Sequence, residues 1–230
     1  MFDRIAGRYD LLNRLLSFRQ DVRWRKMIAR HLPDLAEPKL LDVATGTADV
    51  ILTLMQQRRH IRRAVGVDMA RQMLAFGREK VLREEVAVKV DLIPADAAFL
   101  PFKSGSFDVV TISFGIRNVL HLNKALKEFF RVLTPRGRLL VLEFSLPQNR
   151  LIKTGYLFYF RHILPRLGGA ISGDNYAYRY LNETAETFPY GRDFCLLLEE
   201  AGFADVKALP LTFGVATLYV ADKKQSEANG

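Results

Sequence analysis

The sequence of 230 residues contains one cysteine, Cys195, so the chain cannot form an internal disulfide bond. A lone cysteine in a chain of this type is typical of a reducing compartment, and we expect a cytoplasmic location. Cys195 lies in the apolar run Phe-Cys-Leu-Leu-Leu, which indicates a buried structural thiol. The four histidines are isolated and lack the spacing of metal ligands, so we expect no metal site.

The sequence also has no apolar run that reaches the ~18 residues of a membrane-spanning helix. Its first residues lack the apolar segment of a secretory signal, so we expect a soluble or peripheral protein. The net charge of +9 favours an anionic partner, which is a nucleic acid, an anionic lipid or a phosphorylated substrate. Because no recognisable nucleic-acid-binding motif is present, we do not expect a nucleic-acid partner. Contact with the inner face of a membrane and homodimer formation both remain open.

No internal repeat or low-complexity linker divides the chain, and apolar segments of strand length alternate with segments of helix length. This alternation predicts an α/β fold with a doubly wound, mostly parallel sheet of seven strands, covered by helices on both faces. The predicted strands span residues 39–44, 64–68, 88–94, 107–113, 138–144, 204–209 and 217–221. The predicted helices among them span residues 49–59, 70–83, 123–133 and 192–201.

We expect residues 1–230 to form a single domain. Within it, residues 1–36 are predicted to form an N-terminal helical cap and residues 39–145 a cofactor-binding core. Residues 147–190 are rich in aromatic side chains and are predicted to form a helical insert on the substrate side. The insert is interpreted either as a channel for a lipid tail or as ordinary core beneath a cap helix. Residues 191–222 supply the final helix and strands.

The segment from Leu41 to Val50, Leu-Asp-Val-Ala-Thr-Gly-Thr-Ala-Asp-Val, follows a predicted strand and opens a predicted helix. Gly46 has no Cβ, so the backbone can turn tightly there and approach a ligand. The segment lacks the Gly-x-Gly-x-x-Gly fingerprint of dinucleotide-binding sites, because Ala44 and Asp49 stand where glycines are needed. A pyrophosphate-containing cofactor such as NAD is therefore not expected.

Polar residues follow the first four predicted strands, and the carboxyl ends of parallel strands form the ligand-binding edge of such a sheet. Asp42 is placed to attract the cationic amine of a bound amino acid. Asp68 comes 22 residues after Gly46 and is placed to accept both hydroxyls of a ribose. Asp96 and the next backbone N–H, of Ala97, suit an adenine edge, and Ser113 faces the same crevice. Together these groups predict a site for S-adenosylmethionine (SAM), which has no pyrophosphate.

Longer segments resemble the ubiquinone/menaquinone biosynthesis C-methyltransferase family (UbiE/MenG) over nearly the whole chain. The most specific are Ile112-Ser-Phe-Gly-Ile-Arg-Asn-Val119 and Gly137-Arg-Leu-Leu-Val-Leu-Glu-Phe-Ser145. The match also includes Phe2-Asp-Arg-Ile-Ala-Gly-Arg-Tyr-Asp-Leu-Leu-Asn13 and Tyr176-Ala-Tyr-Arg-Tyr-Leu181. The family turn usually reads Gly-Thr-Gly, whereas this chain has Gly46-Thr47-Ala48, and the extra methyl group reduces clearance at the methionine end of the cofactor.

The resemblance implies a class I SAM-dependent methyltransferase that acts on a ring carbon of a demethylated quinol with a polyprenyl tail. It also implies SAM contacts at Thr47, Asp68, Asp96, Ala97 and Ser113, which agrees with the crevice predicted above. With Met69, which follows Asp68, the predicted cofactor-binding residues are Asp42, Gly46, Thr47, Asp68, Met69, Asp96, Ala97 and Ser113.

The predicted catalytic residues are Arg117, Asn118 and Tyr9. A quinol hydroxyl has a pKa of ~10, like tyrosine, and its deprotonation pushes electron density onto the neighbouring ring carbon. The Arg117 cation is expected to lower that pKa and stabilise the phenolate, with Asn118 as a hydrogen-bond partner. Tyr9 is expected to close the site. The competing interpretations are a structural ion pair for Arg117 and a packing role for Tyr9.

Three other functions remain open at this point. The first is a SAM-dependent methyltransferase that acts on another small molecule. The second is a nucleic-acid binder that uses the positive charge, which predicts salt-dependent binding. The third is a scaffold protein that has lost catalysis through Ala48.

Overall fold

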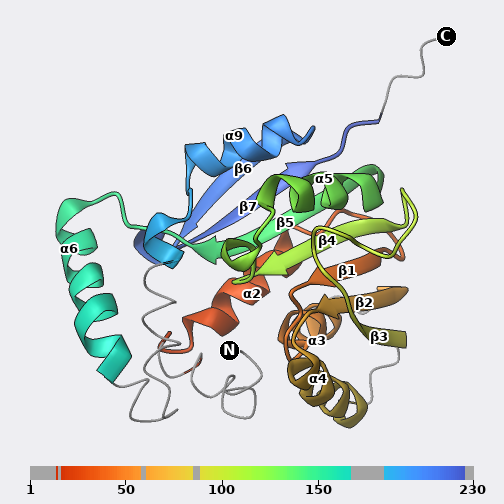
Figure 1. Cartoon of the computed structure of the whole chain (residues 1–230), viewed down its shortest axis with the longest axis horizontal. Helices are drawn as coiled ribbons and strands as arrows, with labels where there is room; N and C mark the ends of the chain where they lie inside the picture. The colour runs from red at the N-terminus through yellow and green to blue at the C-terminus, as the bar shows by residue number, and fades with distance from the viewer. Residues whose placement is uncertain (1–13, 15–16, 58–60, 85–88, 167–183, 226–230) are drawn as a thin grey trace.

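The computed structural model describes residues 14, 17–57, 61–84, 89–166 and 184–225, and their main feature is a seven-stranded sheet (Figure 1). The strand order is β3-β2-β1-β4-β5-β7-β6. The first five strands in this order, β3, β2, β1, β4 and β5, are parallel to one another. β7 is antiparallel to both of its neighbours, β5 and β6. The strands are β1 (Lys39–Val43), β2 (Arg63–Asp68), β3 (Lys89–Pro94), β4 (Phe107–Ser113), β5 (Leu133–Phe144), β6 (Ala204–Leu211) and β7 (Ala216–Asp222). The predicted doubly wound, mostly parallel sheet is therefore confirmed.

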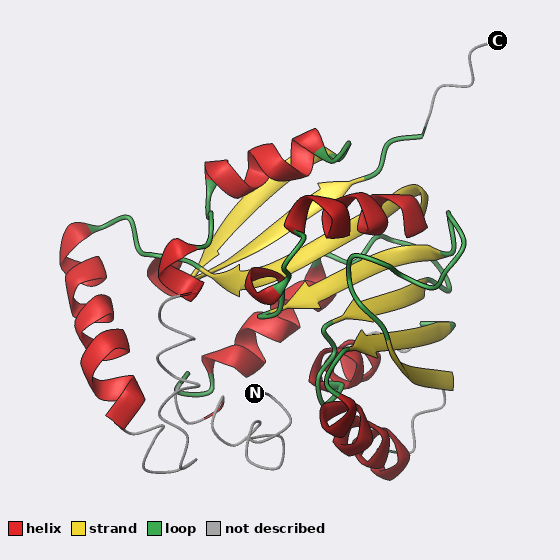
Figure 2. Cartoon of the chain, in the orientation of Figure 1, coloured by secondary structure: helices red, strands yellow, loops and turns green. Residues whose placement is uncertain are grey.

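Helices cover both faces of this sheet (Figure 2). One face carries α2 (Gln20–Arg30), α3 (Asp49–Gln57) and α4 (Arg71–Arg83), and the other carries α5 (Leu122–Val132) and α9 (Arg192–Glu200). β1 shows why both faces need a cover, because Leu40 packs with the first group of helices and Leu41 with the second. Cys195 of α9 is buried in the second core, as predicted.

The chain changes direction across the sheet at β1. From β1 it runs through α3 to β2 on one side, and β4 pairs with β1 on the other side. In open α/β sheets, ligands bind at such a switch point, outside the carboxyl ends of the strands. The site is therefore expected beyond Val43 and Ser113, the last residues of β1 and β4.

The start of the fifth strand differs from the prediction. The sequence predicts a helix that ends at residue 133 and a strand that begins at residue 138, but β5 already begins at Leu133. Its pairing with β4 shifts register between Phe107 and Val109, and Arg136 has a φ of 67°, so this part of β5 is a bulge. Within the predicted cap, the described helix is α2, and residues 1–13 lie outside the described part of the chain.

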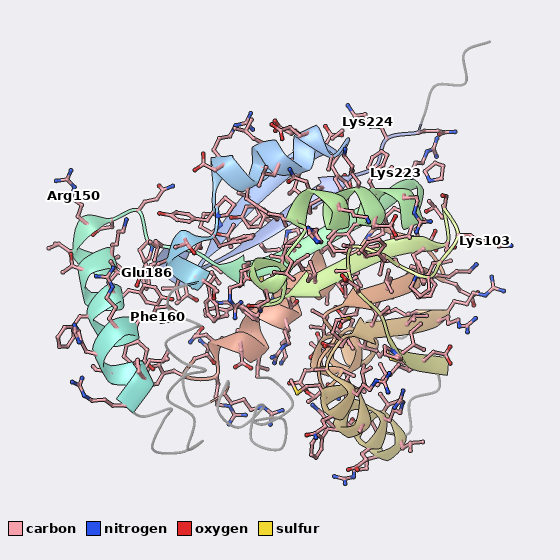
Figure 3. The ribbon with its side chains drawn as sticks, in the orientation of Figure 1. Lys103, Arg150, Phe160, Glu186, Lys223 and Lys224 are labelled. Carbon is pink, nitrogen blue, oxygen red and sulfur yellow. The ribbon has the colours of Figure 1, made fainter. Side chains whose placement is uncertain are left out.

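The predicted helical insert is described in part. It contains α6 (Arg150–Phe158), which continues into the π-helical turn η2 (Tyr159–Ile163), whereas residues 167–183 lie outside the described residues. α6 stands beside the sheet rather than on either face (Figure 1). Arg150 points away from the rest of the molecule, while Phe160 and Glu186 lie between α6 and the sheet (Figure 3). Among the described residues, no helix is long and apolar enough to cross a membrane.

Candidate cofactor and methyl-acceptor site

A cavity of about 520 Å³ lies at the carboxyl ends of β1 to β4. Its volume falls within the range of pockets that bind small molecules and cofactors. Seven residues predicted from the sequence line it, namely Gly46, Asp68, Met69, Asp96, Ala97, Ser113 and Asn118. The sheet therefore brings together residues that are far apart in the sequence at the switch point.

The turn after β1 forms the floor of this cavity. Ala44, Gly46 and Ala48 all have a positive φ, of 51°, 55° and 64°. This left-handed conformation costs an alanine roughly 1–2 kcal/mol, whereas glycine adopts it freely. The Ala48 N–H donates to the carbonyl of Thr45 at 2.9 Å, which closes the turn before α3 begins. The methyl group of Ala48 is fully buried in the core on the α2 side, so it does not line the cavity.

Asp68 joins this turn to the end of β2. Its Oδ2 accepts a hydrogen bond from the Gly46 N–H and its Oδ1 accepts one from the Ala70 N–H, both at 2.8 Å. A carboxylate is an acceptor-only group with two oxygens, which suits the two hydroxyls of a vicinal diol such as a ribose. Asp68 also lines the cavity, so its carboxylate is in a position to contact a ligand.

Asp42 and Thr47 lie beneath the turn rather than in the lining of the cavity. The Asp42 carboxylate is buried and accepts hydrogen bonds from the hydroxyls of Thr45, at 2.7 Å, and Thr111, at 2.6 Å. Burial raises the pKa of Asp42 to about 7, against the opposing effect of these two bonds. The structure therefore places Asp42 as a link between β1, its turn and β4, and outside the lining of the cavity.

The Thr47 hydroxyl accepts a hydrogen bond from Lys80 Nζ of α4 at 3.1 Å. Lys80 also pairs with Asp49, the first residue of α3, and Asp49 pairs with Arg25 of α2 at 3.3 Å. This chain of charged groups ties the three helices of one face to the turn. Sequence reasoning gave no sign of it, because the residues are far apart along the chain.

Asp96 lies after β3, on the other side of the cavity. Its Oδ1 accepts a hydrogen bond from the Ala98 N–H at 2.8 Å, which fixes the loop after the strand. Asp96 and Ala97 both line the cavity, together with Phe99, whose side chain is 60% exposed. A carboxylate, a backbone amide and an aromatic ring on one side of a pocket suit a flat, nitrogen-rich ring such as adenine.

The end of β4 carries polar atoms that lack a partner. Among the described residues, three buried side-chain atoms have no hydrogen bond, and all three lie in this segment: Ser113 Oγ, Arg117 Nε and Asn118 Oδ1. Buried polar atoms are almost always paired, because each unpaired one costs about 1–3 kcal/mol. Ser113 and Asn118 line the cavity. Their unused capacity therefore points to a polar ligand at this end of the cavity.

Arg117 lies in the wall behind the lining. Its Nη1 donates to Glu143 Oε1 at 2.6 Å and to the carbonyl of Phe114 at 2.8 Å. The guanidinium also lies 5.4 Å from the ring centre of Phe144. Arg117 therefore forms the structural ion pair that was the alternative to a catalytic role. Its Nε atom nevertheless has no hydrogen-bond partner among the described residues. Tyr9, the third predicted catalytic residue, lies outside the described residues.

Several lining residues were not predicted from the sequence. They are Val43, Ala44, Ala70, Met73, Ala95, Phe99, Phe114, Gly115, Val119, Leu120 and His121. Phe114 and Gly115 lie in the Ser-Phe-Gly-Ile-Arg-Asn segment that carried the resemblance, so that segment was the available signal. Gly115 is required by packing, because a Cβ there would lie 2.4 Å from the Cβ of Ala44. Among the described residues, no cluster of His, Cys, Asp and Glu could hold a metal ion.

The cavity can be compared with the parts of SAM. Asp68 offers acceptors for ribose hydroxyls, and Asp96 with Ala97 offers partners for adenine. The unpaired Ser113 and Asn118 atoms provide further polar contacts. No turn for a pyrophosphate is needed, and none of the glycines of a dinucleotide fingerprint is present beyond Gly46. The residues present therefore fit SAM.

Comparisons with other proteins show the same fold and identify the family. Solved structures with the same fold include a SAM-dependent methyltransferase from Thermotoga maritima, described as a possible histamine N-methyltransferase. It has a TM-score of 0.65 and 19% identity over 97% of this chain and 98% of that one. A SAM-dependent methyltransferase from Aquifex aeolicus has a TM-score of 0.64 and 16% identity, over 86% and 89% of the two chains. At these identities the likeness shows the fold alone.

Two relatives are far more similar in sequence. This chain is 47% identical to the demethylmenaquinone methyltransferase of Thermus thermophilus, over 97% of this chain and 100% of that protein. It is 48% identical to the ubiquinone/menaquinone biosynthesis C-methyltransferase UbiE of Syntrophotalea carbinolica, over 95% and 91% of the two chains. The model of the ubiE/COQ5 methyltransferase family matches residues 1–223. The chain therefore belongs to the ubiE/COQ5 methyltransferase family.

Proposed function

We propose that this chain transfers the methyl group of SAM to a ring carbon of a polyprenylated quinol. It is a SAM-dependent methyltransferase, in agreement with its family and with the relatives named for demethylmenaquinone and for ubiquinone/menaquinone biosynthesis. The observation that carries the proposal is the cavity at the switch point, with the unpaired atoms of Ser113 and Asn118 beside it. These atoms lie where a polar ligand would complete their hydrogen bonds.

Bound SAM supplies a methyl group that its sulfonium centre has already activated. In the proposed complex, Asp68 accepts hydrogen bonds from the ribose hydroxyls and Asp96 with Ala97 contacts the adenine. Ser113 and Asn118 supply polar contacts between the cofactor and the acceptor ring. Asp42 and Thr47 act indirectly, because both hold the turn from beneath. The main task of these residues is orientation, since a methyl donor and an acceptor carbon react when they are held in line at about 3–3.5 Å.

On the acceptor side, Arg117 is proposed to stabilise the quinol oxygen as it loses its proton. A guanidinium stays protonated at all physiological pH values, so the proton passes to water rather than to Arg117. Stabilisation of the phenolate lowers the pKa of the quinol hydroxyl and raises electron density at the neighbouring ring carbon. Bound SAM would supply its methyl group to that carbon, with the carbon–sulfur bond breaking to leave a neutral thioether. The hydrogen of the ring carbon would then pass to water as a proton, which restores the aromatic ring.

Methyl transfer to two acceptors tests this proposal. Purified protein is supplied with SAM that carries a labelled methyl group, together with demethylmenaquinol or the demethylated methoxy-benzoquinol of ubiquinone synthesis, both kept reduced. Label in either quinol supports the proposal, and the ratio of the two rates identifies the preferred nucleus. If SAM binds but neither quinol gains label, the quinol assignment is wrong and another small-molecule acceptor is favoured.

We also propose that α6 contacts an anionic membrane surface, from which a polyprenyl tail would be drawn. None of the residues from Arg150 to Phe158 is buried, and Leu151 and Phe158 are 84% and 60% exposed. Their apolar side chains accompany the basic residues Arg150, Arg161 and Arg166 on the same helical segment. Apolar side chains combined with positive charge favour the interface of an anionic leaflet. A cytoplasmic location at the inner face of the membrane follows from this proposal.

Liposome sedimentation tests the membrane contact. The variants Leu151→Ser and Phe158→Ser are expected to reduce binding to vesicles of anionic lipid, as is the pair Arg161→Gln and Arg166→Gln. Leu82→Ser is a matched control, because Leu82 is 79% exposed but lies on α4. Unchanged binding of these variants, or an equal loss in the Leu82 variant, would exclude this surface.

A further inference from the structure

The pairing of β4 with β5 brings Glu143 beside Arg117. Ser113 pairs with Leu142 in this register, so Glu143 lies one residue beyond the end of β4. The next turn of chain after β4 is η1 (Ile116–Asn118), which contains Arg117. Glu143 is almost fully buried, with 1% of its side chain exposed. A carboxylate at this depth needs strong partners, because desolvation of an unpaired charge is costly.

The hydrogen bonds of Glu143 converge on Arg117. Its Oε1 accepts from Arg117 Nη1 at 2.6 Å and from the Phe144 backbone N–H at 2.9 Å. Its Oε2 lies 3.4 Å from the backbone nitrogen of Arg117. One carboxylate therefore holds both the main chain and the side chain of this arginine. The Phe114 carbonyl and the Phe144 ring hold the guanidinium from two further directions.

These contacts leave part of the arginine unused. Arg117 Nε is buried and has no partner among the described residues. Phe114, three residues before Arg117, and Asn118, the next residue, both line the cavity, so Arg117 lies directly behind its lining. A guanidinium that is fixed on one side and unpaired on the other is prepared to donate to a ligand oxygen without having to reorganise.

Tyr156 connects this pair to the insert. Tyr156 is partly buried, and the resulting desolvation raises the pKa of its hydroxyl; the charge of Arg117 opposes that shift, and the charge of Glu143 adds to it. Tyr156 also packs in one apolar cluster with Phe144, the residue whose ring lies beside the Arg117 guanidinium. It also stacks on Phe160, with ring centres 5.1 Å apart. The pair therefore lies where the sheet edge meets the helix proposed for the acceptor side.

We infer that Glu143 is a positioning residue for methyl transfer, which fixes the Arg117 guanidinium so that Nε faces the acceptor oxygen. This inference rests on the proposed function and assigns a role to a residue outside the cavity lining. Glu143 does not touch the quinol or SAM. Its carboxylate keeps the cation in place, and the position of that cation determines how well the phenolate is stabilised.

The variant Glu143→Gln tests the inference, because it keeps the size of the side chain and removes its charge. We expect kcat for quinol methylation to fall by about a hundredfold, as for other displaced catalytic groups. The dissociation constant of SAM, measured by calorimetry, should change less than about threefold, since Asp68 and Asp96 are untouched. Glu143→Asp keeps the charge but shortens the side chain, and should also lower kcat if position is what matters. If Glu143→Gln does not fold, Glu143→Asp tests the inference in its place.

Asp222→Asn is the matched control. Asp222 pairs with Arg138 of the same strand β5 at 2.6 Å, at the end of the strand opposite the cavity. The control removes a carboxylate from an arginine in the same way, and it should leave kcat unchanged. If kcat falls equally in Asp222→Asn and in Glu143→Gln, the loss of activity reflects a general disturbance of the sheet rather than the position of Arg117.

A pair of acceptors separates a positioning role from a merely structural one. A quinol with a ring halogen has a more acidic hydroxyl and needs less help from a cation, so Glu143→Gln should impair its methylation less than that of the unsubstituted quinol. Equal losses with both acceptors, or wild-type kcat in both Glu143 variants, would overturn the inference. If the wild-type protein methylates neither quinol, the proposed function has failed instead, so the two failures are distinguishable.

Discussion

The carboxylate of Asp68 and the backbone N–H of Gly46 are joined by a hydrogen bond of 2.8 Å. This bond connects the end of β2 to the turn after β1, across 22 residues of sequence. It gives Asp68 two tasks, because the same carboxylate shapes the turn and lines the cavity. The spacing predicted that Asp68 would lie at the strand edge, whereas its bond to the turn needed the structure.

Asp68→Asn should therefore weaken SAM binding by about ten- to a hundredfold, since charge-assisted hydrogen bonds contribute about 1.5–3 kcal/mol each. Isothermal titration calorimetry measures this change. Asp91→Asn is the control, because Asp91 on the neighbouring strand β3 pairs with the exposed Arg63 and does not line the cavity. An unchanged affinity in Asp68→Asn would remove this residue from the cofactor site.

The buried Asp42 predicts a specific dependence of stability on pH. Its pKa is raised from 3.8 to about 7 in the folded chain, mainly by burial. Between these two values the folded state binds more protons than the unfolded state, so this residue makes stability fall as pH rises from 4 to 7, by on the order of 4 kcal/mol in total. Above pH 7 its contribution is constant.

Asparagine resembles protonated aspartic acid and does not titrate. The variant Asp42→Asn should therefore show a smaller decrease in unfolding free energy between pH 4 and pH 7 than the wild type. Urea unfolding at pH 5 and at pH 8 measures it, and the variant should gain stability relative to the wild type at the higher pH. An equal difference between the two proteins at both pH values would contradict the assignment.

Ala48 stands where the resemblance predicts a glycine, and its effect should be small. Ala48→Gly relieves a left-handed alanine, worth roughly 1–2 kcal/mol, but it loses a buried methyl group and gains freedom in the unfolded chain, worth about 1–2 kcal/mol together. The net change in unfolding free energy should be within about 1 kcal/mol. SAM affinity should stay the same, because the methyl group faces the core. A tenfold gain in affinity would show that Ala48 obstructs the cofactor.

Gly115→Ala should be far more disruptive. The added Cβ would lie 2.4 Å from the Cβ of Ala44, so the turn after β1 or the loop after β4 would have to move. We expect a lower melting temperature and at least a tenfold loss of SAM affinity, about 1.4 kcal/mol. Gly155→Ala on α6 is the control, since a Cβ added there would meet no atom of the described residues within 4 Å, and helical Gly→Ala changes stabilise by about 0.5–1 kcal/mol. Equal behaviour of the two variants would contradict the steric argument.

Much of the fold was predictable because each strand is a short apolar run between polar segments. β4 was predicted at its observed bounds, and β1 to within one residue, since both are buried on two faces. The early start of β5 was not predictable, because Thr134-Pro-Arg-Gly137 has turn composition and joins the sheet only through a bulge against Phe107. Tertiary pairing decided this boundary, as it often does where local propensity is weak.

The candidate site was predictable at the strand ends and less so elsewhere. Asp68, Asp96 and Ser113 reach the cavity because every parallel strand ends at the same edge. Asp42 belongs to the same pattern, yet its side chain points to Thr45 and Thr111, and strand position alone does not reveal such a direction. The pairing of Arg117 with Glu143 joins residues 26 apart in the sequence, so only the register of β4 and β5 shows it.

Nuclear magnetic resonance of the product from SAM labelled with ¹³C at its methyl group tests the central claim most directly. With demethylmenaquinol or the demethylated methoxy-benzoquinol as the acceptor, whichever reacts faster, the account predicts a single labelled methyl group bonded to a ring carbon, formed by the wild-type protein and greatly reduced in Asp68→Asn. A labelled methoxy group would show that oxygen is the acceptor, and the absence of label from both demethylmenaquinol and the demethylated methoxy-benzoquinol would show that this chain does not act on these quinols. Either result would contradict the account.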